Sequence, residues 1–160
     1  MATNLKSLAK DTAIYGVSSI FGRFLNYLLV PLYTATLSAA SGGYGVITNL
    51  YAWTALLLVI LTYGMETTFF RFANKADEDA EKVYSTTLVS VGATALMFVA
   101  AVVGFLPSIS SALGYADHQS WVVSMAIIVA LDAFQAIPFA YLRYKKQPIK
   151  FAGLKLAFIF

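Results

Sequence analysis

Two ionisable side chains stand in long apolar stretches of this 160-residue sequence, where each could act on a charged ligand. Arg23 precedes 42 residues, Phe24 to Met65, that carry no charge. Asp132 follows Trp121 by 11 residues in a similarly apolar stretch. Inside a membrane, a guanidinium would attract an anionic group, and a carboxylate would serve as counter-ion or proton carrier. The pair is therefore interpreted either as a transport site or as an ion pair that only holds helices together.

The neighbours of Arg23 place polar and small groups on its side of a helix. Arg23 lies about 11 residues into the apolar segment, which at 1.5 Å per residue is roughly 16 Å deep, near the midplane of a bilayer. An arginine there costs about 2.5–3.5 kcal/mol on insertion scales, so we expect this face to turn toward a bundle or a water-filled cavity. The neighbours, at spacings of three and four, are Tyr15, Ser19, Gly22 and Asn26.

Two further charges close the next apolar stretch. Glu66 and Arg71 fall in its last turns, near a membrane surface. One interpretation is that Arg71 extends to the lipid headgroups and pairs locally with Glu66. The other is a gate or substrate contact on the cytoplasmic side. Near Asp132, the side chains of Gln135 and Pro138 follow within two helical turns.

Composition excludes most catalytic chemistry. Hydrophobic residues make up 59% of the chain and charged residues 12%, far from the composition of a soluble domain. The sequence has no Cys and one His, His118, so thiolate sites, zinc sites and catalytic triads are not expected. It also lacks a phosphate-binding glycine loop and a His-Glu-x-x-His motif. We expect no enzyme, cofactor or metal, with a membrane transferase as the one enzymatic alternative.

The charge-free runs indicate membrane-spanning helices. A bilayer core needs about 20 apolar residues per helix, and the runs Phe24–Met65 and Val83–Ala116 hold 42 and 34. Barrel strands and a cleaved signal peptide do not fit the pattern. The fold class is therefore predicted as all-α, a polytopic transmembrane bundle with four full spans and the start of a fifth. The predicted spans are about 11–37, 44–72, 83–106 and 120–144, with the fifth starting about 150, a break at Ser41-Gly42-Gly43 and an end at Pro107.

The basic residues predict the orientation of these spans. The loops 38–43 and 107–119 contain no Lys or Arg, so the basic groups alternate with uncharged loops as the positive-inside rule requires. We therefore expect a cytoplasmic N-terminus and a solvated cytoplasmic connector at 74–82. The net charge of +3 then reflects topology and contact with anionic lipid, not binding of nucleic acid. The groups are Lys6 and Lys10, then Arg71, Lys75 and Lys82, then Arg143, Lys145, Lys146 and Lys150.

The stretch from Asn26 to Phe72 resembles the opening of bacterial polysaccharide flippases and exporters. These proteins are relatives of the lipid II flippase and of the multidrug and toxin extrusion transporters. The resemblance is carried by the order and spacing of short pieces, and it covers the rest of the chain loosely. The pieces are Lys10–Thr12, Gly22–Arg23, Pro31–Thr34, Tyr44–Gly45 and Gly64–Phe72.

The resemblance implies a function and a location. Members of this family flip undecaprenyl-diphosphate-linked oligosaccharides across the bacterial inner membrane for cell-surface polysaccharides such as lipopolysaccharide. They do so by alternating access between two helical bundles, sometimes with a coupling ion. Arg23 matches a usual arginine of the first helix, and Glu66 and Arg71 match charges that close the second. Asp132 matches no motif of the family.

Two departures qualify this expectation. Ala35 stands where many members have Arg after Pro-Leu-Tyr-Thr, and the spans predicted for residues 1–160 make up only the N-terminal part of a first bundle. Transport would then need a second bundle or an oligomer. An ion-coupled small-molecule exporter of the same fold and a non-transporting membrane scaffold remain the alternatives to a flippase.

Overall fold

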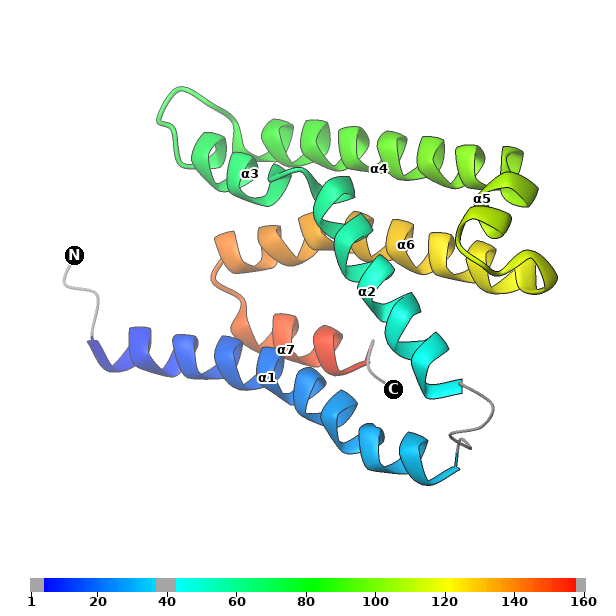
Figure 1. Cartoon of the computed structure of the whole chain (residues 1–160). Helices are drawn as coiled ribbons and strands as arrows, with labels where there is room; N and C mark the ends of the chain where they lie inside the picture. The colour runs from blue at the N-terminus through cyan, green and yellow to red at the C-terminus, as the bar shows by residue number, and fades with distance from the viewer. Residues whose placement is uncertain (1–4, 37–42, 158–160) are drawn as a thin grey trace. The chain divides into compact units, whose positions relative to one another are not determined.

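The computed structural model describes residues 5–36 and 43–157, and every regular element in them is a helix (Figure 1). The all-α prediction is therefore confirmed for this part of the chain. The elements are α1 (Leu5–Thr36), α2 (Gly43–Thr62), α3 (Met65–Ala73), α4 (Ala80–Gly104), α5 (Leu106–Ala112), the 3-10 helix η2 (Ala116–His118), α6 (Gln119–Tyr144) and α7 (Pro148–Ala157).

Three stretches of the described chain are long and apolar enough to cross a membrane. They are Gly43–Ala73, Ala80–Gly104 and Ala116–Tyr144. Their lengths of 31, 25 and 29 residues exceed the roughly 20 residues that a bilayer core requires. The first predicted span, the total of four and the cytoplasmic N-terminus stay predictions. The predicted break at Ser41-Gly42 lies outside the described residues.

The second predicted span is not one continuous helix. α2 ends at Thr62 and α3 begins at Met65, because Tyr63 and Gly64 adopt positive φ angles of 31° and 73°. Left-handed backbone cannot continue an α-helix, and it is more accessible to glycine than to other residues. The two helices consequently run in different directions (Figure 1).

The loop predicted to start at Pro107 is also partly helical. α4 ends at Gly104, and Pro107 sits in the first turn of α5 instead of closing the preceding helix. Proline is tolerated in a first turn, because the N–H that it lacks has no intrahelical acceptor there. The predicted connector at 74–82 is exposed from Asn74 to Asp79, and the Asp79 carboxylate accepts a hydrogen bond from the Glu81 N–H at 2.9 Å, which caps α4.

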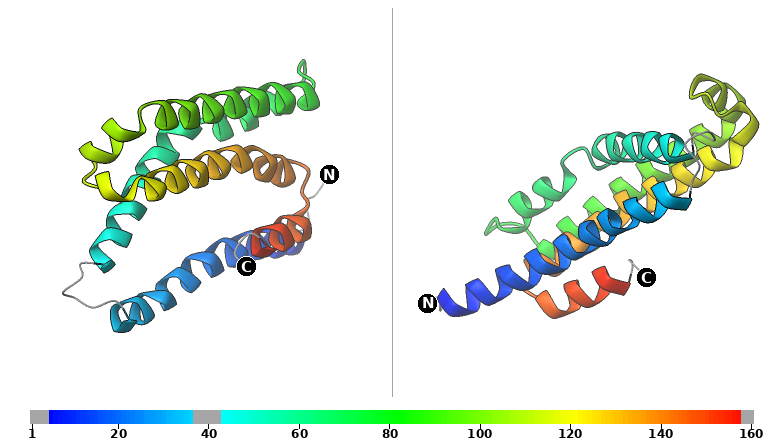
Figure 2. Two further views of the ribbon diagram at one scale, coloured as in Figure 1. Left: turned by 90° about the vertical axis from the view of Figure 1, so that its right-hand side faces the viewer. Right: turned by 60° about the horizontal axis from the view of Figure 1, so that its bottom comes forward.

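The described residues fall into two compact units, one made of residues 5–36, 43–47 and 141–157 and the other of residues 48–140. In the second unit, α4 and α6 lie side by side (Figure 2). Their contact is close, since a Cβ placed on Gly92 of α4 would lie 3.3 Å from the Phe134 ring of α6. The buried core of this unit consists of Leu61, Val91, Ala95, Met125, Val129, Ala130, Ala133 and Ile137.

Aromatic and polar contacts join the shorter elements of the second unit. α3 packs against α4, where the fully buried Phe69 ring meets the Tyr84 ring edge-on at 6.4 Å between centroids. At the other end of α4, Tyr115 is buried, and its hydroxyl accepts a hydrogen bond from the Asn49 side chain at 3.2 Å. These contacts fix the ends of the apolar helices within this unit.

In the first unit, α7 packs along α1, and the two helices lie side by side in both views of Figure 2. Phe151 of α7 is 4% exposed and meets the Tyr15 ring of α1 edge-on, with 5.0 Å between centroids. Edge-to-face contacts of this kind add about 0.5–1.5 kcal/mol beyond the burial of apolar area. The candidate site lies beside this contact.

Candidate functional site

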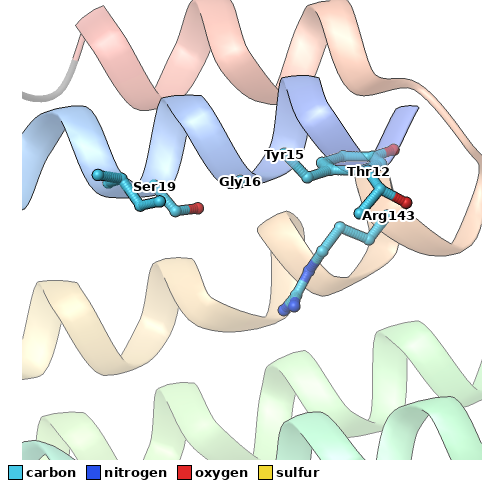
Figure 3. A pocket seen from close by; sticks show the side chains of 6 residues that line it. Thr12, Tyr15, Gly16, Ser19 and Arg143 are labelled. Atoms are coloured by element: carbon cyan, nitrogen blue, oxygen red, sulfur yellow. The ribbon is translucent and has the colours of Figure 1, made fainter. Parts of the chain in front are cut away.

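A groove lies along α1 in the first unit (Figure 3). It has a volume of about 540 Å³ and is formed by one face of α1 together with the last turn of α6. Its lining side chains combine a cation, hydroxyl groups and an aliphatic group. We call it the α1 groove, and the residues that line it are Thr12, Tyr15, Gly16, Ser19, Ile20 and Arg143.

The helical repeat explains why α1 presents these residues together. Positions three and four residues apart lie on one helix face, so Thr12, Gly16 and Ser19 form a stripe along the groove. A Cβ placed on Gly16 would meet no atom within 4 Å, so space is open above the helix backbone there. A ligand can approach the backbone closely at a glycine, because no side chain stands between them.

Arg143 provides the cation of the groove. It lies in the last turn of α6, is half-buried, and places its Cζ 6.0 Å from the centroid of the Phe151 ring. That distance is at the outer limit for a cation–π interaction. Because the Phe151 ring also contacts Tyr15, the guanidinium, the phenol and the buried ring form one cluster.

The turn between α6 and α7 makes this cluster possible. Lys146 adopts a left-handed conformation with φ of 53°. The Leu142 carbonyl accepts a hydrogen bond from the Gln147 N–H, and the Arg143 carbonyl accepts one from the Lys146 N–H, both at 3.0 Å. This pair of bonds is the Schellman arrangement that ends helices. Pro148 then begins α7 directly, which returns the chain along α1.

The two predicted site residues of the first span lie on α1. Arg23 follows Ser19 by four residues, so its Cα lies in the same row as the groove residues. The side chains of Arg23 and Asn26 lie outside the described residues. Their predicted roles therefore stay predictions.

Glu66 and Arg71 both lie on the short helix α3. Glu66 is half-buried in the first turn, and Arg71 is exposed in the last turn. At about 100° per residue, a separation of five residues turns the two side chains about 140° apart around the helix. This geometry disfavours the local Glu66–Arg71 pair that the sequence suggested as one interpretation.

Asp132 lies half-buried in the middle of α6, as expected for a polar group inside a span. The Gln135 side-chain amide donates a hydrogen bond to its carboxylate, with 2.5 Å between Nε2 and Oδ1. The Gln135 Oε1 is buried and has no hydrogen-bond partner among the described residues. The structure therefore brings Asp132 and Gln135 together, while the ion pair of Asp132 with Arg23 stays a prediction.

Sequence reasoning did not assign Arg143 to a site. It was one of four basic residues after the fourth span and was interpreted as a marker of orientation. One signal distinguished it, because it is the only arginine in that group, and arginine recognises anions through a planar fork that lysine lacks. Its contact with Phe151 and its place opposite α1 depend on the packing of α7, which no local pattern predicts.

The groove is suited to binding a polar group. Among the described residues, no group of three or more His, Cys, Asp or Glu side chains is placed to hold a metal ion. The groove instead offers Arg143 with the hydroxyls of Thr12, Tyr15 and Ser19. Such a set can hold an anionic, oxygen-rich group next to an apolar one.

Comparison with known proteins supports a specific family. No curated protein and no solved structure matches the chain. The family model described as "Polysaccharide biosynthesis protein" matches residues 8–147, a region that contains the α1 groove, α3 and the Asp132–Gln135 pair. Together with the three apolar stretches of membrane-spanning length, this match indicates a membrane protein with a part in polysaccharide biosynthesis or export. Because the match covers most of its length, the chain belongs to the polysaccharide biosynthesis protein family.

Proposed function

We propose that this protein takes part in flipping an undecaprenyl-diphosphate-linked oligosaccharide across the bacterial inner membrane for cell-surface polysaccharide. The observation that carries the proposal is the family match over residues 8–147, which covers all three apolar stretches of membrane-spanning length. The substrate has a large polar head on an apolar chain. Moving such a head across a bilayer needs polar groups that face a path away from lipid.

The polar positions on the apolar helices have distinct roles in this proposal. Arg23, with Asn26 one turn further along α1, pairs with the diphosphate, because a desolvated guanidinium binds phosphate oxygens in two parallel hydrogen bonds. Asp132, held by Gln135, serves as counter-ion or proton carrier. Glu66 and Arg71 contact the substrate head at the cytoplasmic end of the path. A second helical bundle or a further copy of the chain completes the path.

The test replaces Arg23 in the native gene. Arg23→Ala is expected to reduce surface polysaccharide by about tenfold or more, because a lost charge-assisted contact costs roughly 1.5–3 kcal/mol. Arg23→Lys keeps the charge and loses the fork, so it should retain part of the activity. Asp77→Ala, at an exposed position of the connector after α3, removes a charge outside the apolar stretches, serves as the control and should export normally. Wild-type surface polysaccharide in Arg23→Ala cells with normal protein levels would contradict the role of Arg23.

A second candidate function is supported by the half-buried Asp132–Gln135 pair. A carboxylate held inside an apolar helix can carry a proton, which is the chemistry of an ion-coupled small-molecule exporter. In that case Asp132→Asn abolishes drug efflux from a sensitised strain and leaves surface polysaccharide unchanged. If Asp132→Asn instead loses surface polysaccharide and leaves drug resistance unchanged, the flippase function is favoured.

A further inference from the structure

The α1 groove carries chemistry that none of the five predicted site residues uses. We propose that it is a binding site for an anionic phospholipid of the bilayer, with Arg143 as the group that holds the phosphate. This site would anchor the first unit to the membrane lipid and is independent of the translocated substrate. The argument rests on the cation, the room above Gly16, the apolar end of the groove and the surrounding charge.

The cation lies beside aromatic neighbours of its own unit. The Arg143 guanidinium lies 6.0 Å from the Phe151 ring, which is 4% exposed and is itself held edge-on by the Tyr15 ring. A guanidinium restrained by buried neighbours loses less side-chain entropy on binding than one on a free surface. Its planar fork matches two oxygens of a phosphate.

The wall opposite Arg143 supplies hydroxyls and space. Thr12 and Ser19 both line the groove from α1, and Gly16 lies between them. Because no atom would lie within 4 Å of a Cβ at Gly16, a headgroup can lie against the helix backbone at this point. In Figure 3, Arg143 lies near Thr12 and Tyr15, and Ser19 lies further along α1.

The other end of the groove suits a hydrocarbon chain. Ile20 lines it and is 65% exposed, and Val17 and Phe24 on the same helix are exposed as well. Arg143, Thr12 and Tyr15 therefore lie toward one end of the groove, and Ile20 adds an apolar side chain next to Ser19 at the other end. The basic residues predict that the N-terminal end of α1 lies at the cytoplasmic surface, so a lipid placed this way has its phosphate at headgroup level and its chain in the bilayer.

The charge around Arg143 favours an anionic lipid over a zwitterionic one. Lys145, Lys146 and Lys150 are exposed in the following turn and in α7, and they outnumber Asp11, the one acidic residue in the sequence of α1, which directly precedes Thr12. Each basic residue near an anionic leaflet adds to the attraction for a negative headgroup. A lipid with a net negative headgroup therefore gains more here than one whose headgroup is neutral overall.

The test measures lipid binding to the purified complete protein by native mass spectrometry. The probes are phosphatidylglycerol, phosphatidylcholine, a polyprenyl phosphate and inorganic phosphate. We expect phosphatidylglycerol to bind best. Arg143→Gln removes the charge and should weaken this binding by about tenfold or more, because a charge-assisted hydrogen bond is lost. Arg143→Lys keeps the charge and loses only the planar fork, so it should weaken binding by less.

A second pair of variants tests the groove without changing its charge. Gly16→Leu fills the space above the backbone and should weaken phosphatidylglycerol binding as strongly as Arg143→Gln. Ala13→Leu adds the same bulk at an exposed position of α1 that does not line the groove, and should bind normally. Lys145→Gln removes one exposed charge two residues from Arg143 and is expected to weaken binding by about fivefold at most, less than Arg143→Gln does, because a surface charge is screened by solvent.

Several results would overturn the proposal. Unchanged binding in both Arg143→Gln and Gly16→Leu, or equal losses in Lys145→Gln, would show that the lipid does not occupy the groove. A preference for polyprenyl phosphate over phosphatidylglycerol would assign the groove to another lipid. None of these results bears on the flippase proposal, which is tested by surface polysaccharide in Arg23 variants.

Discussion

Asp132 and Gln135 show how a polar group is accommodated on an apolar helix. The two residues are three apart on α6, so their side chains meet on one face, and the amide donates to the carboxylate. A bond to an ionised group is worth roughly 1.5–3 kcal/mol, about twice a neutral one. The sequence predicted that Asp132 lies in the middle of a helix and that Gln135 follows within two turns, because helix spacing determines both.

Gln135→Leu is predicted to destabilise the protein. The variant removes the donor to Asp132, and it also removes the buried Oε1 that has no partner among the described residues, which offsets part of the loss. A net decrease of about 1 kcal/mol is expected in the free energy of unfolding, measured by thermal denaturation in detergent. Gln119→Leu makes the same chemical change at an exposed position and should have no such effect. Equal stability of the two variants would contradict the account of the pair.

Arg143 marks the limit of prediction for single residues. The sequence showed that Arg143 lies at the end of an apolar span. It did not show that the Arg143 side chain faces α1. Arg143 lies in the α1 groove because Phe151, eight residues later, returns along α1 and packs on Tyr15. That contact joins positions 136 residues apart in the chain, and neither helical periodicity nor charge patterning reports on such a distance.

Helix boundaries followed the sequence closely where the apolar pattern was uninterrupted. α6 was predicted to begin near residue 120 and to end at Tyr144, and it spans Gln119–Tyr144. The break between α2 and α3 was missed, because a single glycine in an apolar run is compatible with a continuous helix. The helix is interrupted there because Tyr63 and Gly64 both adopt positive φ angles.

Gly64→Ala is predicted to destabilise the break between α2 and α3. Gly64 has φ of 73°, where an L-residue costs roughly 1–2 kcal/mol, so the melting temperature in detergent should fall. Gly45→Ala is the matched control, because Gly45 lies within α2 and a Cβ there meets no atom within 4 Å. The control should be neutral or stabilising by up to about 1 kcal/mol. If Gly64→Ala were as stable as Gly45→Ala, the left-handed conformation assigned to Gly64 would be contradicted.

At the turn between α6 and α7, a substitution to glycine is predicted to stabilise the protein. Lys146 holds a left-handed conformation without being a glycine. Lys146→Gly should therefore raise stability by up to about 1 kcal/mol, since the steric cost of the Cβ is removed and the greater freedom of glycine in the unfolded chain offsets part of the gain. Lys145→Gly, one residue earlier, serves as the control and should give no gain. A loss of stability in Lys146→Gly would mean that this residue does not occupy the left-handed region.

At the scale of the whole molecule, the helical class and the family were predictable from the sequence. The charge-free runs determined the helical class, and short pieces such as Gly64–Phe72 suggested the family that the match over residues 8–147 confirms. The orientation in the membrane rests on the positions of Lys and Arg and stays a prediction. Residues 1–160 contain no cysteine, so thiols introduced into this part of the chain make the orientation testable.

Introduced cysteines are predicted to label from alternate sides of the membrane. Ala76→Cys lies in the exposed connector after α3, where the basic residues predict the cytoplasmic side. Ala116→Cys lies in the exposed segment before α6, where the loop has no Lys or Arg, and should label from outside with a membrane-impermeant maleimide. If Ala76→Cys were labelled in intact cells and Ala116→Cys were protected, the orientation in the membrane would be the reverse of the predicted one.

The most direct test of the central claim measures which leaflet holds the lipid-linked oligosaccharide. Inner-membrane vesicles of known orientation would be prepared from cells with the native gene, without it, and with Arg23→Ala, and probed with a lectin that cannot cross the membrane. The account predicts that the oligosaccharide reaches the outer leaflet only with the native gene and accumulates on the cytoplasmic leaflet in the other two strains. An identical distribution in all three strains would contradict it.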